Sequence, residues 1–171
     1  MASRANEKSG RKGQVLILVG SDSDIPALQD GLDFLKEMGV AYTLDIVSAH
    51  RHPEKAASLS KGARAGGFDV IIAGAGLAAA LPGVVAAHTT LPVIGIPFNG
   101  GSLLGLDALL SIVQMPKGVP VATVGINAAR NACILACEIL SIKDDGLQQK
   151  LEAMKDGMRR EVDRKSRKLR N

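Results

Sequence analysis

Short runs of β-branched and aliphatic residues alternate with longer segments of helical spacing from Gln14 onwards, and this alternation limits the possible folds severely. Five runs predict buried strands, at residues 15–19, 42–47, 70–73, 93–96 and 121–124. The intervening segments predict helices at residues 25–38, 53–65, 81–88, 103–113 and 127–140. The first of these has Asp24 as its cap, Pro26 in its opening turn and Gly39 at its end.

Strands that alternate with helices of this length favour a parallel sheet with right-handed crossovers and helices on both faces. The predicted fold is α/β: a three-layer sandwich with a flavodoxin-like parallel sheet of about five strands, plus a C-terminal helix. We expect residues 1–13 to be a disordered leader and residues 14–140 to form the catalytic domain. Residues 141–171 are predicted to be a helical extension. Its narrow apolar stripe is expected to pack on a neighbouring subunit.

Composition excludes several classes of function. Hydrophobic residues make up 46% of the chain but aromatic residues only 2%, which argues against recognition of nucleic acid by base stacking. The net charge of +4 gathers at the two chain ends, and we interpret it as solvated charge. Cys133 and Cys137 have no second pair of cysteine or histidine residues at the spacing of a metal site. We therefore expect two buried thiols and no bound metal. Without an apolar membrane span or signal peptide, a cytoplasmic location is expected.

Polar or very small residues follow three of the predicted strands, and parallel strands place their carboxyl ends at one edge of a sheet. The loops read Gly20-Ser21-Asp22-Ser23-Asp24, Ser48-Ala49-His50-Arg51 and Gly74-Ala75-Gly76-Leu77. Ser48 and Arg51 can bind a phosphate, and His50 can exchange protons near neutral pH. The glycines of the third loop bring bare backbone close to a ligand. These residues predict a cofactor-free enzyme that acts on a phosphorylated small molecule by proton transfer.

Each of these residues also has a purely structural interpretation. Asp24 can be a simple helix cap, and a histidine such as His50 at a strand end is often structural. The small residues of the third loop can serve close helix-on-sheet packing. His52 can cap the helix that begins at Pro53, and His88 is expected to be structural at the end of its helix. Residues 97–101 and 114–116 are predicted to complete the rim of the site, the first as a glycine-rich lid.

The three loops, with Leu81-Pro82-Gly83 and Ser111-Ile112-Val113-Gln114-Met115-Pro116, resemble the 5-(carboxyamino)imidazole ribonucleotide mutase family of purine biosynthesis. The resemblance spans residues 15–140, and the trailing helix is similar to the family's C-terminal extension. It implies a homo-octamer with sites built from neighbouring subunits. It also implies migration of a carboxylate from the exocyclic nitrogen to ring carbon 4 of the imidazole ribonucleotide, without ATP, metal or cofactor.

The resemblance also implies roles for individual residues. His50 would be the proton shuttle, acting as an acid toward the departing carbamate nitrogen and then as a base for the ring proton. Ser21 and Asp24 would hold the ribose side, and Ser48 and Arg51 the phosphate. Gly74 and Gly76 would leave room for the base and its carboxylate. The remaining substrate-binding residues would be Gly20, Ser23, Ala49 and Leu77.

The third loop departs from the family pattern. The family usually reads Gly-Gly-Ala-Ala-His-Leu-Pro-Gly there, whereas this chain has Leu77 at the second position and Ala80 in place of the histidine. His52 stands where threonine is common. Two alternatives therefore stay open beside the mutase. One is a related carboxylase that acts directly on aminoimidazole ribonucleotide or on a pyridinium mononucleotide. The other is a nucleotide-binding paralogue without catalytic activity.

Overall fold

The computed structural model describes residues 13–170, so nearly all of the predicted leader lies outside the described residues. The strands are β1 (Gln14–Val19), β2 (Ala41–Ile46), β3 (Val70–Gly76), β4 (Val93–Phe98) and β5 (Ala122–Thr123). The helices are α1 (Ile25–Met38), α2 (Pro53–Gly62), α3 (Leu81–Ala87), α4 (Leu106–Val113), α5 (Ala129–Ser141) and α6 (Asp145–Lys168), with a short 3-10 turn, η1 (Asp22–Asp24). The strands form one parallel sheet in the order β2-β1-β3-β4-β5. This order confirms the predicted flavodoxin-like fold.

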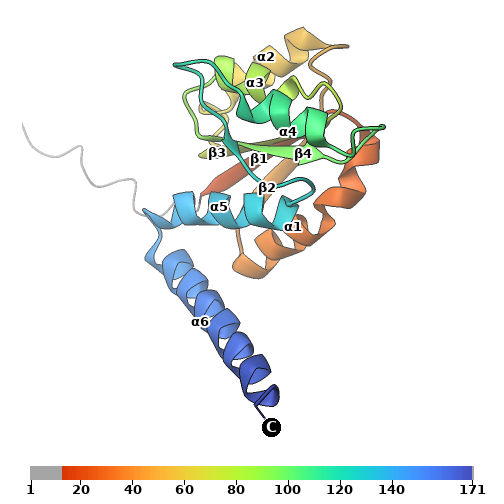
Figure 1. Ribbon diagram of the computed structural model, residues 1–171. Coiled ribbons are helices and arrows are strands. Elements are labelled where there is room, and N and C mark those ends of the chain that lie inside the picture. Colours follow the sequence, from red (N-terminus) through yellow and green to blue (C-terminus); the bar gives the residue numbers. More distant parts are fainter. Residues whose placement is uncertain (1–12, 171) are drawn as a thin grey trace, which may run out of the picture.

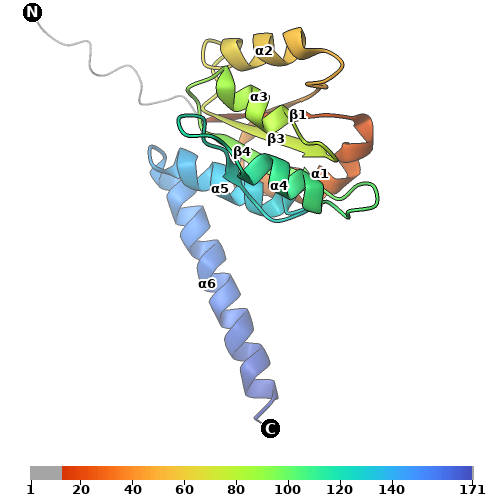
Figure 2. The same ribbon diagram turned by 45° about the horizontal axis from the view of Figure 1, so that its top comes forward.

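Helices cover both faces of the sheet, with α1 and α5 on one side and α2, α3 and α4 on the other (Figures 1 and 2). The alternation of side chains along β1 shows why. Val15, Ile17 and Val19 belong to the core beneath α1 and α5, whereas Leu16 and Leu18 belong to the core beneath the other helices. The three central strands, β1, β3 and β4, each contribute to both cores, as a buried parallel sheet requires.

Two strands of the sheet are longer than predicted. β3 continues through Gly74 to Gly76, and β4 continues to Phe98. Gly74 pairs with Val19 on β1 and with Ile96 on β4, so the predicted third loop begins inside the sheet. Glycine has low strand propensity, but pairing with a strand on each side overrides that preference here.

Two predicted helices begin later than expected, α4 at Leu106 instead of residue 103 and α5 at Ala129 instead of residue 127. The reason is visible in the backbone, because Leu104 has φ of 51° and Asn127 has φ of 56°. Neither value is compatible with a right-handed helix. β5 is shortened to two residues, and it pairs with β4 alone.

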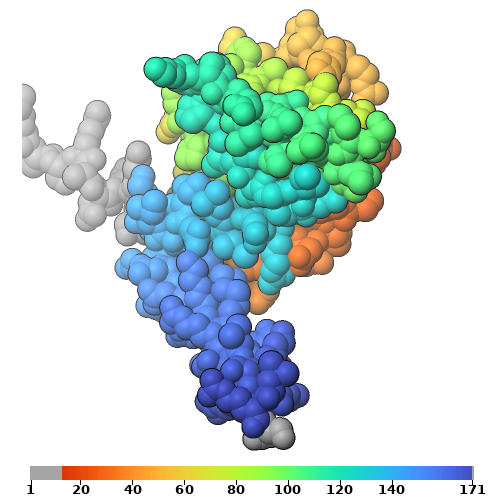
Figure 3. Space-filling view, viewed as in Figure 1, coloured from red at the N-terminus to blue at the C-terminus, as the bar shows by residue number. Residues whose placement is uncertain are grey.

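Helix α6 extends away from the body of the molecule as a long arm (Figures 1 and 3). Leu147 and Leu151 near its start are buried in the core, whereas Met158 is 50% and Val162 is 66% exposed. The apolar stripe is thus used only in its first turns within a single chain. No helix in residues 13–170 is long and apolar enough to cross a membrane.

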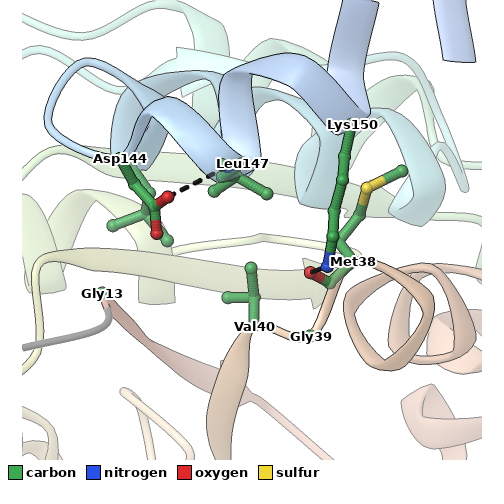
Figure 4. Close-up of a pocket in the computed structure, with 9 residues that line it drawn as sticks. Gly13, Met38, Gly39, Val40, Asp144, Leu147 and Lys150 are labelled. Carbon is green, nitrogen blue, oxygen red and sulfur yellow. Dashed lines mark hydrogen bonds between the residues drawn. The ribbon is translucent and has the colours of Figure 1, made fainter. Parts of the chain in front are cut away.

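A small cavity of about 170 Å³ lies where α6 joins the body, beside Gly13 and Val40 at the amino ends of β1 and β2 (Figure 4). Lys150 donates from Nζ to the carbonyl oxygen of Met38 at 2.7 Å, and Asp144 accepts the N–H of Leu147 at 2.9 Å. Lys150 therefore ties α6 to the end of α1, whereas Asp144 caps the N-terminus of α6 itself. This cavity lies at the structural junction between α6 and the α/β domain.

Candidate active site

A larger cavity, of about 580 Å³, opens at the opposite edge of the sheet, beyond the carboxyl ends of β1, β2, β3 and β4. It is lined by Gly20, Ser21, Ser23, Asp24, Ser48, Ala49, His50, Arg51, Ala75, Gly76, Leu77, Ala78, Leu81, Asn99, Gly100 and Gly101. All the site residues predicted from the sequence are in this set except Gly74. Loops as far apart in the chain as those of Gly20 and Gly101 thus meet at one edge, as the parallel topology requires.

The loop after β1 is a closed hydrogen-bonded turn. The N–H of Ser21 donates to Oδ2 of Asp24 at 3.1 Å, and the N–H of Ser23 donates to Oγ of Ser21 at 3.3 Å. Asp24 stands at the N-cap position of α1, as predicted, but its side chain makes no cap bond to α1. It instead completes the capping box of η1, whose N-cap is Ser21. Burial raises the pKa of Asp24 above its ordinary value, the Ser21 N–H partly offsets this, and Asp22 adds to the rise.

The loop after β2 is organised around Ser48. Its Oγ accepts the N–H of Arg51 at 3.2 Å, and its carbonyl oxygen accepts the N–H of His52 at 2.9 Å. The guanidinium of Arg51 donates to the carbonyl oxygen of Gly20 at 3.4 Å and so links this loop to the first one. His50 lies between these anchors, exposed to the cavity. A cation and an imidazole are thereby held side by side on one wall.

His52 has the structural role that the sequence suggested. Its Nδ1 accepts the N–H of Lys55 at 3.4 Å and caps α2. The same nitrogen lies 3.5 Å from a carboxylate oxygen of Glu54. His52 does not line the cavity, so His50 is the histidine available there.

The loop after β3 folds back on itself before α3. The N–H of Ala79 donates to the carbonyl oxygen of Leu77 at 2.9 Å, and that of Ala80 donates to the carbonyl oxygen of Ala78 at 2.7 Å. Leu77 has a left-handed backbone, with φ of 54°. Ala80 stands just before α3 and does not line the cavity. Because position 80 is an alanine, no polar side chain can extend toward the cavity from it.

Gly74 is not among the residues that line the cavity, and the lack of a side chain there allows close packing. A Cβ atom at this position would lie only 2.3 Å from Cε2 of Phe98. The ring of Phe98 therefore fills the space that a side chain would need. Gly76 is different, because a Cβ there would meet nothing closer than the carbonyl oxygen of Phe98 at 3.5 Å, and Gly76 does line the cavity.

The loop after β4 supplies Asn99, Gly100 and Gly101, which the sequence marked only as part of a glycine-rich rim. The N–H of Asn99 donates to Oδ1 of Asn127 at 2.8 Å, so the segment after β5 fixes the base of this loop. The signal that could have identified Asn99 was its position directly after a strand in the middle of the sheet.

The prediction that residues 114–116 complete the rim is wrong for a single chain. These residues follow α4, which runs back toward the amino ends of the strands, and they line no part of this cavity. Met115 instead lies near Gly83, where a Cβ would be 3.2 Å from its sulfur.

The cavity has two chemically different halves. Asp24, His50 and Arg51 lie beyond β1 and β2, whereas Ala75 and Gly76 end β3 and Leu77 follows it. One half can bind anionic and hydroxyl groups and move a proton; the other can accept a flat, less polar group. Across residues 13–170, no group of three histidine, cysteine, aspartate or glutamate side chains is placed to hold a metal ion.

The sequence profile of the AIR carboxylase family matches residues 14–161. This chain belongs to the AIR carboxylase family. The N5-carboxyaminoimidazole ribonucleotide mutase of Pyrococcus horikoshii is 51% identical over 158 residues, which cover 92% of this chain and 89% of that protein. The mutase of Thermotoga maritima is 52% identical over 156 residues, 91% of each chain. Such mutases are isomerases.

Two further similar proteins extend the comparison. The phosphoribosylaminoimidazole carboxylase of Schizosaccharomyces pombe is 52% identical over 153 residues, which cover 90% of this chain but 28% of that longer protein. The crystal structure of Treponema denticola PurE superposes with a TM-score of 0.83 at 28% identity, covering 93% of this chain and 99% of that one. This similarity agrees with the parallel sheet and flanking helices described above.

Proposed function

We propose that this protein is an N5-carboxyaminoimidazole ribonucleotide mutase, which forms 4-carboxy-5-aminoimidazole ribonucleotide in purine (IMP) biosynthesis. The observation that carries the proposal is the division of the cavity. His50 can transfer protons and Arg51 can bind a phosphate. Both line the same cavity as Gly76, whose lack of a side chain leaves space for a heterocycle. Relatives about half identical to this chain over most of its length are named for this reaction, which supports the assignment.

His50 is the proton shuttle in this proposal. The carbamate nitrogen needs a proton when its bond to the carboxyl carbon breaks, and ring carbon 4 must lose a proton once it has gained that carboxyl group. One imidazole can perform both transfers, first as acid and then as base, because it exchanges protons near neutral pH. The exposed position of His50 beside the cavity supports this role.

The polar half of the cavity would bind the ribose phosphate. Arg51 and the free hydroxyl hydrogen of Ser48 would contact the phosphate, since a guanidinium makes strong charge-assisted bonds to its oxygens. Ser21 and Asp24 would accept hydrogen bonds from the ribose hydroxyls. Gly20, Ser23 and Ala49 shape this end, while Gly76 and Leu77 lie next to the base.

An ultraviolet assay tests the proposal directly. Freshly prepared carboxyamino ribonucleotide is mixed with the protein, without ATP or added bicarbonate, and the carbon-carboxylated product is followed. Enzyme-dependent formation of that product is the expected result. Intact substrate with no product would remove the mutase assignment, and measurable binding without turnover would then identify a non-catalytic paralogue.

A related carboxylase is the second candidate, and the third loop favours it. Leu77 and Ala80 make the loop more apolar than the usual family pattern, and a carboxylase that takes carbon dioxide from solution needs no loop histidine for a substrate carboxylate. The distinguishing assay supplies aminoimidazole ribonucleotide, or a pyridinium mononucleotide, together with bicarbonate. Turnover of these substrates, without turnover of the carbamate, would select the carboxylase.

The proposal includes a homo-octamer with shared active sites and a cytoplasmic location. Support for assembly comes from α6, whose exposed Met158 and Val162 continue the stripe begun by two buried leucines. Sedimentation of the full chain should show a large oligomer that Val162→Glu weakens, and a wild-type monomer would contradict assembly. Burial raises the pKa of the free thiols Cys133 and Cys137 to about 12, which keeps them unreactive and suits a reducing compartment.

A further inference from the structure

Leu77 has an unusual backbone for a leucine. Within residues 13–170, three non-glycine residues have positive φ, namely Leu77, Leu104 and Asn127, and of these only Leu77 lines the large cavity. Asparagine visits the left-handed region readily, whereas leucine does so at a cost. Strained backbone conformations are found most often at functional sites, where the surrounding structure holds them in place.

The side chain of Leu77 reaches from the third loop to the fourth. A Cβ atom built on Gly101 would lie 2.7 Å from Cδ2 of Leu77, and one built on Gly100 would lie 3.9 Å from the same carbon. Leu77 therefore packs against two residues that have no side chain to displace it. Because Leu77 is still 55% exposed, this contact lies at the mouth of the cavity and not in the core.

Leu77 also lies on the less polar half of the cavity. Its neighbours there are Gly76 and Ala78, while His50 and Arg51 line the wall beyond β2. A nucleotide with its phosphate near Arg51 would place its ring between His50 and Leu77. The isobutyl group would then separate the ring from bulk water at the opening between the two loops.

We propose that Leu77 is a positioning residue that covers the reacting carbon of the ring and keeps carbon dioxide in the cavity during transfer. This inference rests on the proposed mutase function. In that reaction the bond from nitrogen to the carboxyl carbon breaks, its electron pair stays on nitrogen, and His50 supplies the proton. Ring carbon 4 then bonds to the released carbon dioxide and returns its proton to His50. Between these steps, Leu77 occupies the route by which carbon dioxide would leave.

The test measures how much carbon dioxide escapes. Excess protein is mixed with the carboxyamino ribonucleotide in buffer that contains carbon-13 bicarbonate. The products are the carbon-carboxylated ribonucleotide and the free amine left when carbon dioxide is lost, and amine formed without protein is subtracted.

The variants are Leu77→Gly, which removes the side chain and the backbone strain, and Leu77→Ala, which removes most of the side chain and keeps the strain. Leu104→Gly is the matched control, because Leu104 has φ of 51° but does not line the cavity.

Both Leu77 variants should give a several-fold larger share of free amine and several-fold more label in the carboxylated product, while Leu104→Gly behaves as wild type. The melting temperature of each variant checks that it is folded. If Leu77→Gly loses turnover, the ratio of the two products formed by Leu77→Ala tests the proposal. If the Leu77 variants form the two products in the same ratio as wild type, or if Leu104→Gly loses as much carbon dioxide as they do, the proposed role of Leu77 is overturned. The proposed mutase function is not affected by either result. A wild-type protein that forms no carbon-carboxylated product would overturn the mutase function and this inference with it.

Discussion

The loops after β1 and β2 are held by side-chain hydrogen bonds, whereas the loops after β3 and β4 are shaped by residues with little or no side chain. Asp24 and Ser48 each accept a backbone N–H within their own loop. Across the cavity, Leu77 and Gly101 both have left-handed backbones, and the leucine packs on the glycine. The loops after β1 and β2, with Asp24, His50 and Arg51, form a polar wall of the cavity, where hydrogen bonds fix polar groups in place. The end of β3 and the loops after β3 and β4, with Gly76, Leu77 and Gly101, form a bare wall, which leaves space for a ligand and covers it with one apolar side chain. Changes to the first should alter chemistry and binding; changes to the second should alter packing and shielding.

The largest effect is expected from His50→Asn on the polar wall. Loss of an acid–base group typically lowers turnover by about 100-fold or more. Affinity for the nucleotide should stay within about tenfold, because phosphate contacts dominate binding. Steady-state kinetics and calorimetry with the product measure the two quantities.

His52→Asn is the matched control for this experiment, since His52 caps α2 and does not line the cavity. Asparagine can also cap a helix, so turnover should stay near that of wild type. Unchanged turnover in His50→Asn would remove His50 from the mechanism.

A smaller effect is expected from Arg51→Met on the same wall. Hydrogen bonds to charged groups contribute about 1.5 to 3 kcal/mol, so KM should rise by about 10- to 100-fold while kcat changes less. Arg51→Lys should recover part of the loss, because it keeps the charge but not the two-pronged geometry. Arg64→Met is the control, as Arg64 bonds to Thr90 away from the cavity. A loss of kcat at unchanged KM would contradict the phosphate-binding role.

Two glycines of β3 offer the next comparison, within the bare wall. Gly74→Ala places a methyl group 2.3 Å from the ring of Phe98 and should lower the free energy of unfolding by about 1 to 3 kcal/mol, as overpacked cores do. Gly76→Ala has room for its methyl group at 3.5 Å and should change stability by less than about 0.5 kcal/mol. Because Gly76 lines the cavity, that variant should instead reduce activity.

Urea unfolding of both variants, with activity measured beside it, checks this pair. Equal destabilisation by the two substitutions would mean that Phe98 can move aside. A catalytic defect in Gly74→Ala at full stability would restore Gly74 to the site.

The polar wall was predictable from the sequence because its geometry is local. Ser21 bonds to residues two and three positions away, and Ser48 bonds to residues three and four positions away. Strand ends in a parallel sheet bring such loops together whatever the details of packing. His50, Arg51 and Asp24 therefore line the cavity as expected, although the Asp24 side chain bonds within the capping box of η1 and not to α1.

The bare wall was less predictable because its geometry depends on distant partners. Gly74 looks like a loop glycine until Phe98, 24 positions later, is seen to fill its space. The left-handed backbone of Leu77 has no local signal, since leucine rarely adopts it. Residues 114–116 were misplaced because the direction of α4 was not used, although the parallel topology implied it.

The smallest effect concerns Asp24 and the pH dependence of stability. Burial raises the folded-state pKa of Asp24 above its ordinary value of 3.8. As pH rises past that ordinary value, the unfolded chain loses this proton first, so the folded state holds more protons and the free energy of unfolding falls. The fall continues through the raised folded-state pKa and then stops. In Asp24→Asn this contribution is absent, so its stability relative to wild type should increase with pH across that window and then level off.

Urea unfolding of wild type and Asp24→Asn at a series of mildly acidic pH values measures the difference. Asparagine can still accept the N–H of Ser21, so the capping turn should survive. Asp24→Ala removes that acceptor and should cost about 1 kcal/mol, as the loss of a cap does. A flat difference between wild type and Asp24→Asn would mean that burial and the Ser21 N–H cancel. A difference that falls with pH would mean that the Ser21 N–H outweighs burial. The carboxylate would then be stabilised in the fold, and the polar wall would carry its negative charge at lower pH than burial alone would allow.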